Sequence, residues 1–321
     1  MAPATLFKHE VDSQPWPELD YAQWKDTCAT LHLWTQIVGK IRLAQTPWLN
    51  HAWHVPLYVT TQGLSTSPIP YDKRTFQIDF DLVNHLLLIE TNDGAVTSMP
   101  LKGRSVADFY ASLLAVLGSL GLRVRIHKTP SEMVDGIAFD QDHRHATYDP
   151  QAAHRFGQAL VQTDRVFKQF RARFIGKCSP VHFFWGSFDL AVTRFSGRPA
   201  PQHPGGVPNC PDWVTREAYS HEVSSCGFWP GGEALPYPVF YAYAYPEPFG
   251  FKSAAVRPKG ARYNADFHEF ILPYEEVRLA PEPDVMLLDF LQSSYDAVAN
   301  LGRWDRAALE RTLPPKQHDP D

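Results

Sequence analysis

The chain has 321 residues, of which 44% are hydrophobic and 13% aromatic, enough apolar material for one large domain or two domains of ordinary size. Its 28 prolines and high aromatic content favour a sheet-rich protein with long ordered connections over a helical bundle or a disordered chain. The net charge is −5 without a run of Lys or Arg, so we expect no nucleic-acid partner and no anionic membrane partner.

Targeting and redox signals point to the cytoplasm. Residues 1–20 lack the apolar stretch of a signal peptide, and the longest nearly apolar run, 109–122, is too short to span a bilayer. The four cysteines lie far apart and form no CxxC pair, which disfavours a zinc knuckle or a thioredoxin-type site. We therefore expect a cytoplasmic protein with reduced thiols.

The first half of the chain, residues 1–128, has the pattern of a helix, a group of strands and a second helix. Helically spaced apolar residues predict a long helix from Asp20 to about Gln45, with Asp20 as its N-cap. The further expected elements are strands at 53–63, at 75–82, on both sides of a turn at 92–94 and at 122–128, and a helix at 105–121.

A polar, irregular stretch at 129–148 is interpreted as the connection to a second half, 149–321, with the same order of elements. That half predicts helices at 149–176, 284–302 and 304–311, and strands at 181–195, 218–225, 238–246 and 267–274. The likeness of the strand–helix units 98–121 and 271–302 suggests an internal duplication. We expect an α+β fold of two similar halves, each a mainly antiparallel sheet flanked by long helices.

Three strands of the second half each combine an apolar or small face with a polar and aromatic face, because side chains alternate along a strand. The polar faces carry Trp185, Ser187, Asp189 and Thr193; Ser220, Glu222 and Ser224; and Tyr241, Tyr243 and Tyr245. Trp, Tyr and Ser suit a binding surface better than a solvated sheet face. The sequence predicts one pocket if the strands are neighbours, and an ordinary solvated face is the alternative.

The candidate catalytic groups are the carboxylates Asp189 and Glu222, assisted by His221 and His182. Two like charges in one pocket raise the pKa of one of them, which prepares an acid and a base, although paired structural carboxylates are the plainer interpretation. The candidate substrate-binding residues are Trp185, Ser187, Arg194, Ser224, Tyr241 and Tyr243. A guanidinium such as that of Arg194 suits a bound carboxylate or phosphate, with an internal ion pair as the alternative.

Other motifs are weaker. His221-Glu222 is not a zinc-protease motif, because Ser225 stands where the second histidine is needed. The loop with Asp140, Asp142, His143 and His145 has metal-ligand residue types, but such loops are more often solvated. Cys226 is either a nucleophile near His221 or an inert thiol. The chain has no P-loop, no GxGxxG and no GxSxG motif. We name no metal-ligating residues, and the cofactor and the presence of a bound metal stay open.

Three strings, "GKCSPVHFFWGSFDLAVTRFSGR", "YSHEVSSCGFWPGG" and "FYAYAYPEP", resemble an uncharacterised bacterial family that is classed as a domain of unknown function. The likeness extends over nearly the whole chain. It implies a single-family protein from bacteria, and it carries over no activity and no functional residues.

The leading hypothesis is therefore an enzyme that uses acid–base chemistry on a small molecule in an aromatic-lined pocket of the second half. A non-catalytic protein that binds a metabolite in the same pocket is the first alternative. A module whose aromatic face meets a protein partner is the second. Substrate, reaction and oligomeric state stay open at this point.

Overall fold

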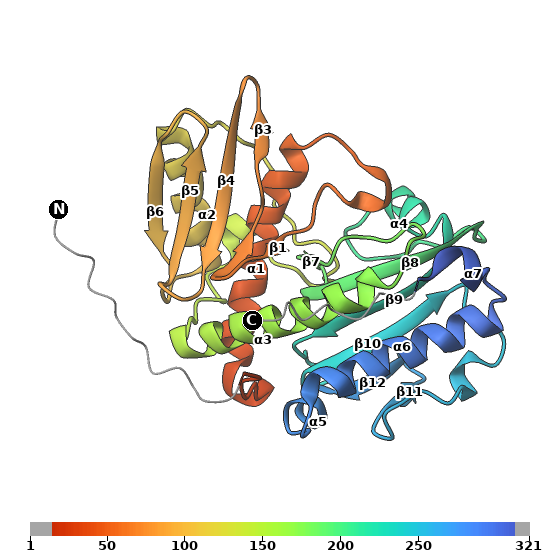
Figure 1. The fold of residues 1–321 in the computed structure, drawn as a ribbon. Coiled ribbons are helices and arrows are strands. Elements are labelled where there is room, and N and C mark those ends of the chain that lie inside the picture. Colours follow the sequence, from red (N-terminus) through yellow and green to blue (C-terminus); the bar gives the residue numbers. More distant parts are fainter. Residues whose placement is uncertain (1–14, 312–321) are drawn as a thin grey trace, which may run out of the picture.

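The computed structural model describes residues 15–311, which form seven α-helices and two antiparallel sheets of six strands each (Figure 1). The predicted α+β fold with two sheet-containing halves is confirmed. The internal duplication stays a prediction. Within the described residues, none of the helices combines the length and the apolar character needed to cross a membrane.

The N-terminal sheet has the strand order β1-β2-β4-β5-β6, and β3 pairs with β4 beyond β2. Its strands are β1 (Tyr58–Val59), β2 (Gly63–Ser65), β3 (Ile69–Tyr71), β4 (Arg74–Asp81), β5 (Leu86–Thr91) and β6 (Val96–Pro100). Helix α2 (Val106–Ser119) packs behind these strands, and Ser105 caps it by accepting a hydrogen bond from the Asp108 amide.

The C-terminal sheet has the strand order β11-β12-β10-β9-β8-β7. Its strands are β7 (His182–Phe184), β8 (Asp189–Pro199), β9 (His221–Trp229), β10 (Val239–Tyr245), β11 (Arg262–Asn264) and β12 (Glu269–Pro273). The remaining helices are α1 (Tyr21–Gln45), α3 (Pro150–Ala172), α4 (Asp212–Ala218), α5 (Tyr274–Arg278), α6 (Pro283–Leu301) and α7 (Arg306–Leu309).

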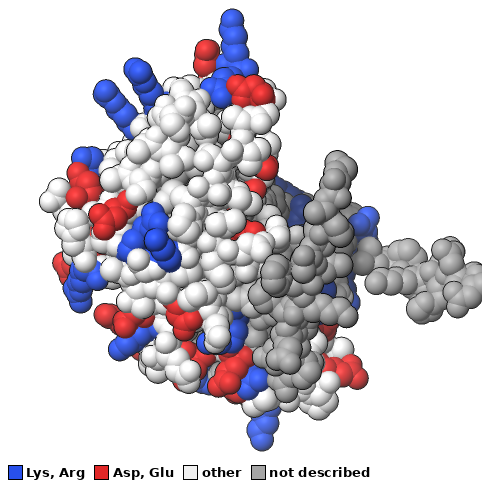
Figure 2. Space-filling view, turned by 90° about the vertical axis from the view of Figure 1, so that its left-hand side faces the viewer, with Lys and Arg blue, Asp and Glu red and all other residues white. Residues whose placement is uncertain are grey.

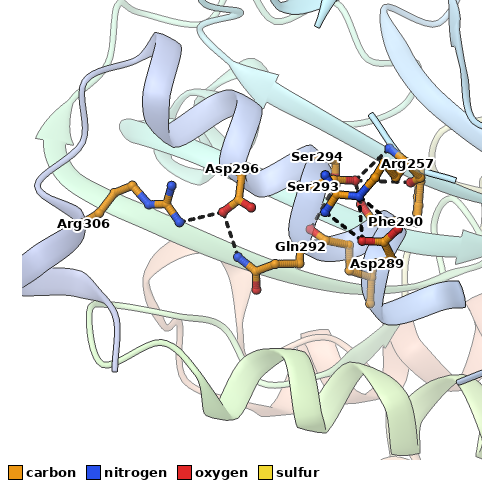
Figure 3. Close-up of polar contacts among 9 residues, drawn as sticks. Arg257, Asp289, Phe290, Gln292, Ser293, Ser294, Asp296 and Arg306 are labelled. Atoms are coloured by element: carbon orange, nitrogen blue, oxygen red, sulfur yellow. Dashed lines mark hydrogen bonds and ion pairs between the residues drawn. The ribbon is translucent and has the colours of Figure 1, made fainter. Parts of the chain in front are cut away.

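Helices α3 and α6 cover one face of the C-terminal sheet (Figure 1). The buried Arg194 of β8 shows this contact, because its guanidinium lies 3.5 Å from the ring centre of Phe170 and 4.4 Å from that of Tyr295. Ion pairs fix α6 from outside: Arg257 bonds to Asp289 and Arg306 to Asp296 (Figure 3). Because α3 and α6 cover one face of the C-terminal sheet, its other face is contacted by other parts of the chain.

The two halves share one hydrophobic core. Leu57 and Phe183 exchange backbone hydrogen bonds of 2.8 and 2.7 Å, which join the segment before β1 to β7. Trp34 of α1 stacks on Phe109 of α2 at 4.6 Å between ring centres, and α1 also contacts α3. The buried apolar side chains therefore form a cluster that is continuous from the first half to the second.

Several predicted elements differ from the structure. The predicted strand 181–195 is a hairpin, because residues 185–188 turn the chain and Phe188 adopts a φ of 62°. The segment 122–128 alternates between buried and exposed residues but has no neighbouring strand, so it forms no ladder. The segment 53–63 contains only the two residues of β1 and the start of β2. Helices α4 and α5 and strands β3 and β11 were not predicted.

Figure 2 shows the side of the molecule that carries the N-terminal sheet. Lys and Arg residues on this face are interspersed with Asp and Glu, and neither sign forms a continuous patch over the described residues. Such a surface offers no concentrated field for a polyanion on this face.

Candidate functional site

A cavity of about 800 Å³ lies against the face of the C-terminal sheet opposite α3 and α6. Its floor consists of side chains from β8, β9, β10 and β12. Its walls are the 185–187 turn, residues 48–55 before β1, residues 131–132, and the loop and helix between 203 and 219. Because the segments 48–55 and 131–132 precede residue 149, the cavity lies at the junction of the two halves.

The strand register decides which side chains enter the cavity. Ala191, Gly227 and Tyr241 lie directly across from one another on β8, β9 and β10. Two residues further along, Thr193, Ser225 and Tyr243 form the next row, and the hydroxyls of Thr193 and Ser225 are 2.8 Å apart. Side chains in directly opposed positions share a face, so both rows look into the cavity.

Gly227 makes room for Tyr241. A Cβ atom at position 227 would lie 2.3 Å from the Tyr241 ring, closer than any real contact. The glycine thus lets the ring lie across β9, with its hydroxyl directed to Asp189 of β8. The close approach of the Tyr241 ring to Gly227 explains why a glycine occurs in the middle of a central strand.

Asp189 is the central anion of the cavity. Its residue is 6% exposed, Tyr241 donates a hydrogen bond to Oδ2, and the Ser187 hydroxyl donates one of 2.7 Å to Oδ1. Burial raises the pKa of Asp189, and these two hydrogen bonds counter the rise. Both donors are neutral, so Asp189 has no cationic partner among the described residues.

Two glutamates accompany Asp189 in the cavity wall. Burial of its carboxyl group and the Asp189 charge raise the pKa of Glu132 to about 7, against the opposing effects of Ser187 and Lys40, although the residue as a whole is exposed. The same two causes raise the pKa of Glu269 to about 8. Gly186 permits the approach of Glu132, because a Cβ there would lie 2.0 Å from Oε1. Two carboxyl groups thus change protonation near neutral pH.

These shifts predict how stability depends on pH. The folded-state pKa values exceed the ordinary value of 4.5, so the stabilisation is complete below pH 4.5 and is lost as pH rises through about 7 and about 8. The double variant Glu132→Gln/Glu269→Gln should therefore gain stability relative to the unmodified protein as pH rises from 5 to 8. Solvent in the cavity screens the charges and limits the size of this gain.

Thermal unfolding at several pH values measures this difference. The matched control is Glu275→Gln, which replaces an exposed glutamate that pairs with Arg278 on α5. A melting-temperature difference between the double variant and the unmodified protein that stays constant with pH would contradict the assignment.

Aromatic side chains form most of the remaining wall. Those that line the cavity are Trp48, Trp53, Trp185, Trp213, Trp229, Tyr219, Tyr241, Tyr243, Tyr245, Phe184, Phe195 and Phe267. Tyr219, at the end of α4, shares a 2.8 Å hydrogen bond with Tyr243. Trp48 and Trp213 pack at 4.5 Å between ring centres. The cavity therefore presents large apolar surfaces with a few polar tips.

The loops that form the rim are joined to one another. The Glu132 amide donates to the Pro208 carbonyl at 2.8 Å, and the Asn209 side chain donates to the Met133 carbonyl at 2.7 Å. On another side, Glu217 of α4 accepts a 2.8 Å hydrogen bond from the Trp48 indole. These bonds preform the cavity, as is usual for small-molecule sites.

Five of the ten residues proposed from the sequence line the cavity: Trp185, Ser187, Asp189, Tyr241 and Tyr243. The indole of Trp185 donates a hydrogen bond of 2.9 Å to the Val55 carbonyl, which ties the turn to the segment before β1. The five lie together because the β7–β8 hairpin and β10 meet on the same side of the sheet.

The other five lie outside the cavity. The expectation that Glu222 and Ser224 share a face with Asp189 is wrong, because the cavity-facing residues of β9 are the odd-numbered ones. Glu222 instead forms a 2.6 Å ion pair with Arg198. Arg194 lies behind the sheet among aromatic rings, where it donates a hydrogen bond to the Phe170 carbonyl. Within residues 15–311 it forms no ion pair with a carboxylate.

The two histidines are also displaced from the cavity. His182 is buried beside Phe184, and burial, Arg42 and Arg171 lower its pKa to about 3. His221 lies at the end of β9, where Ser220 is its hydrogen-bond partner at 3.0 Å. Neither ring lines the cavity, so neither is placed to assist Asp189.

The residues of the weaker sequence motifs are paired with neighbouring side chains or buried. Asp142 accepts a 2.7 Å hydrogen bond from His145, and Asp140 pairs with Lys128. Within residues 15–311, no three His, Cys, Asp or Glu side chains converge as metal ligands. Cys226 is buried behind the sheet, and burial raises the pKa of its thiol, which is the state of an inert cysteine.

Sequence reasoning missed Glu132, Glu269 and Gly227. Glu269 shares a strand face with Phe267 and Ile271 in "FHEFILPY", and a carboxyl group on such a face is a usable signal. Its place beside Tyr243 depends on the register of β12 with β10. Glu132 lies in the stretch interpreted as a connection and has no local signal. Gly227 inside a strand is a recognised sign of close approach.

Comparison with known proteins identifies a family but no activity. No curated protein and no solved structure matches the chain. One family model matches residues 16–311, which is nearly the whole chain and includes every residue of the cavity wall described above. The chain belongs to this family, which is described as a family of unknown function, DUF5996.

Proposed function

We propose that the protein is an enzyme that carries out acid–base chemistry on a small organic molecule held in this cavity. The observation that carries the proposal is the placement of three carboxyl groups, of Asp189, Glu132 and Glu269, in one aromatic-lined cavity. The volume of about 800 Å³ falls within the range of small-molecule sites.

The three carboxyl groups divide into two roles. Asp189 is the fixed anion, since each of its two oxygens accepts a hydroxyl hydrogen bond that holds the carboxylate in place. Burial, and after it the charge of Asp189, keeps protons on Glu132 and Glu269 up to about pH 7 and about pH 8, respectively. A general acid or base works best when its pKa lies close to the working pH, so these two groups are the proton donors and acceptors.

A non-catalytic binding protein is the second candidate. The hydrogen bonds to both oxygens of Asp189 favour it, because a carboxylate held in this way suits recognition better than proton transfer. The two functions differ in what happens to the ligand. The enzyme changes or exchanges its protons, whereas the binding protein returns it unaltered.

The test begins with a thermal-shift screen of metabolites, since a ligand of the folded state raises the melting temperature. Each stabilising compound is then incubated with the protein in D₂O and followed by NMR. We expect conversion or deuterium incorporation that falls by about 100-fold in Glu132→Gln or Glu269→Gln and is retained in Glu275→Gln. Tight binding in D₂O without conversion or exchange would favour the binding protein.

A further inference from the structure

Carboxyl groups dominate the ionisable side chains of the cavity wall. Among the described residues that line the cavity there are three carboxyl groups, three histidines (His51, His203 and His268) and no Lys or Arg. Burial lowers the pKa of His51 and of His203, which favours their neutral forms. Lys40 of α1 interacts with Glu132, but it lies outside the wall, where it donates a 2.9 Å hydrogen bond to Ser131. A bound phosphate or carboxylate would therefore meet negative charge without a compensating cation.

Two of the carboxylates lack a counter-ion. Neither Asp189 nor Glu269 forms an ion pair within residues 15–311, and the donors to Asp189 are the neutral hydroxyls of Tyr241 and Ser187. A buried negative charge without a partner is costly, and a cationic ligand would supply the missing partner.

The uncharged part of the wall also suits a cation. The π face of an aromatic ring attracts an ammonium group, most strongly for Trp and then for Tyr. The cavity offers five tryptophans and four tyrosines, and the rings of Tyr241 and Tyr243 lie nearly parallel, 6.1 Å apart, on the floor next to Asp189. The same rings would cover an apolar ligand body.

We propose that the ligand is an organic cation, an ammonium group carried on an apolar body. Its charge lies between Asp189 and Glu269, and its body lies against the aromatic wall. This inference rests on the proposed function, because it names the substrate class of the same cavity. A neutral ligand would leave the charge of Asp189 unpaired, and an anion would be repelled.

Proton linkage is a consequence of the assignment. Glu132 faces Asp189, Lys40 and Cys210, and Glu269 faces Asp189, Tyr241 and Tyr219. A cation stabilises the ionised form of a carboxyl group and lowers its pKa. Binding near neutral pH therefore releases protons, and affinity rises with pH through about 7 and about 8.

Three probes of similar shape test the charge preference: 2-phenylethylammonium, 2-phenylethanol and 3-phenylpropanoate. Calorimetric titration of the full-length protein in two buffers of different ionisation enthalpy measures affinity and the protons released. We expect the ammonium probe to bind at least about tenfold more tightly than the other two and to release protons. This preference should fall about tenfold in Asp189→Asn and in Glu269→Gln, and persist in Glu275→Gln.

The other outcomes separate the two proposals. If the alcohol or the carboxylate binds as tightly as the ammonium probe, the cationic ligand is refuted and the cavity remains a small-molecule site. If the ammonium probe does not bind at up to ~10 mM, the cationic ligand is refuted as well. Failure of all three probes, together with a metabolite screen without a stabilising compound, would contradict the proposed function too. Glu269→Gln keeps the test valid if Asp189→Asn does not fold.

Discussion

Replacement of Asp189 by Asn is expected to lower the pKa of both Glu132 and Glu269 and to reduce turnover of the cavity's substrate by about 100-fold or more. The Asp189 charge is a cause of the raised pKa in both glutamates, so its loss removes that contribution. The amide is nearly isosteric, and its oxygen still accepts one of the two hydrogen bonds that Tyr241 and Ser187 donate to Asp189. Its NH₂ group replaces the other acceptor oxygen and donates, so the second hydroxyl must turn to act as the acceptor. NMR titration of the glutamate carboxyl carbons measures the shift without knowledge of the substrate.

The matched control is Asp289→Asn, which removes an exposed carboxylate of α6 that pairs with Arg257 (Figure 3). It should leave the titration of Glu132 and Glu269 unchanged. Unaltered pKa values in Asp189→Asn would mean that burial alone raises them. The roles assigned to the three carboxyl groups would then be wrong.

Replacement of Gly227 by Ala is expected to destabilise the protein by about 1–3 kcal/mol and to disrupt the cavity floor. The added Cβ would lie 2.3 Å from the Tyr241 ring, which neighbouring strands and Asp189 hold in place. The ring must move away, and Asp189 then loses its hydrogen bond. Chemical denaturation measures the loss of stability, and ligand binding measures the damage to the cavity.

Gly118→Ala is the matched control, because Gly118 lies in helix α2 and a Cβ there meets nothing within 4 Å. That variant should be as stable as the original chain or more stable, by up to ~1 kcal/mol. Equal stability of the Gly227 and Gly118 variants would show that Tyr241 does not depend on the glycine.

The β9 strand shows the limit of a pattern argument. Alternation along "SHEVSSCGFW" correctly separates Glu222 and Ser224 from Val223 and Ser225, because it follows from the geometry of a single strand. It does not say which set faces the helices. We expected the set with the glutamate in the pocket, and the register with β8 and β10 places Ser225 there instead.

The cavity also depends on segments whose local sequence does not predict that they form its wall. Glu132 itself has a φ of 63° and lies in a stretch without regular structure. Hydrogen bonds between residues 132–133 and residues 208–209 hold this stretch where the Glu132 carboxyl group reaches Ser187. Trp48 comes from the first half and is held by Glu217 of α4. A sequence argument confined to residues 149–321 therefore missed two walls of the cavity.

The sequence alone determined the α+β class, the long helices, the N-cap at Asp20 and the concentration of tyrosines on one side of β10. These features follow from backbone geometry and from neighbours a few residues apart, so a local pattern suffices. Only the tertiary structure decided that Asp189, Glu132 and Glu269 share one cavity. Their pKa values depend on burial and on one another's charge, and both are set by contacts between segments far apart in the chain.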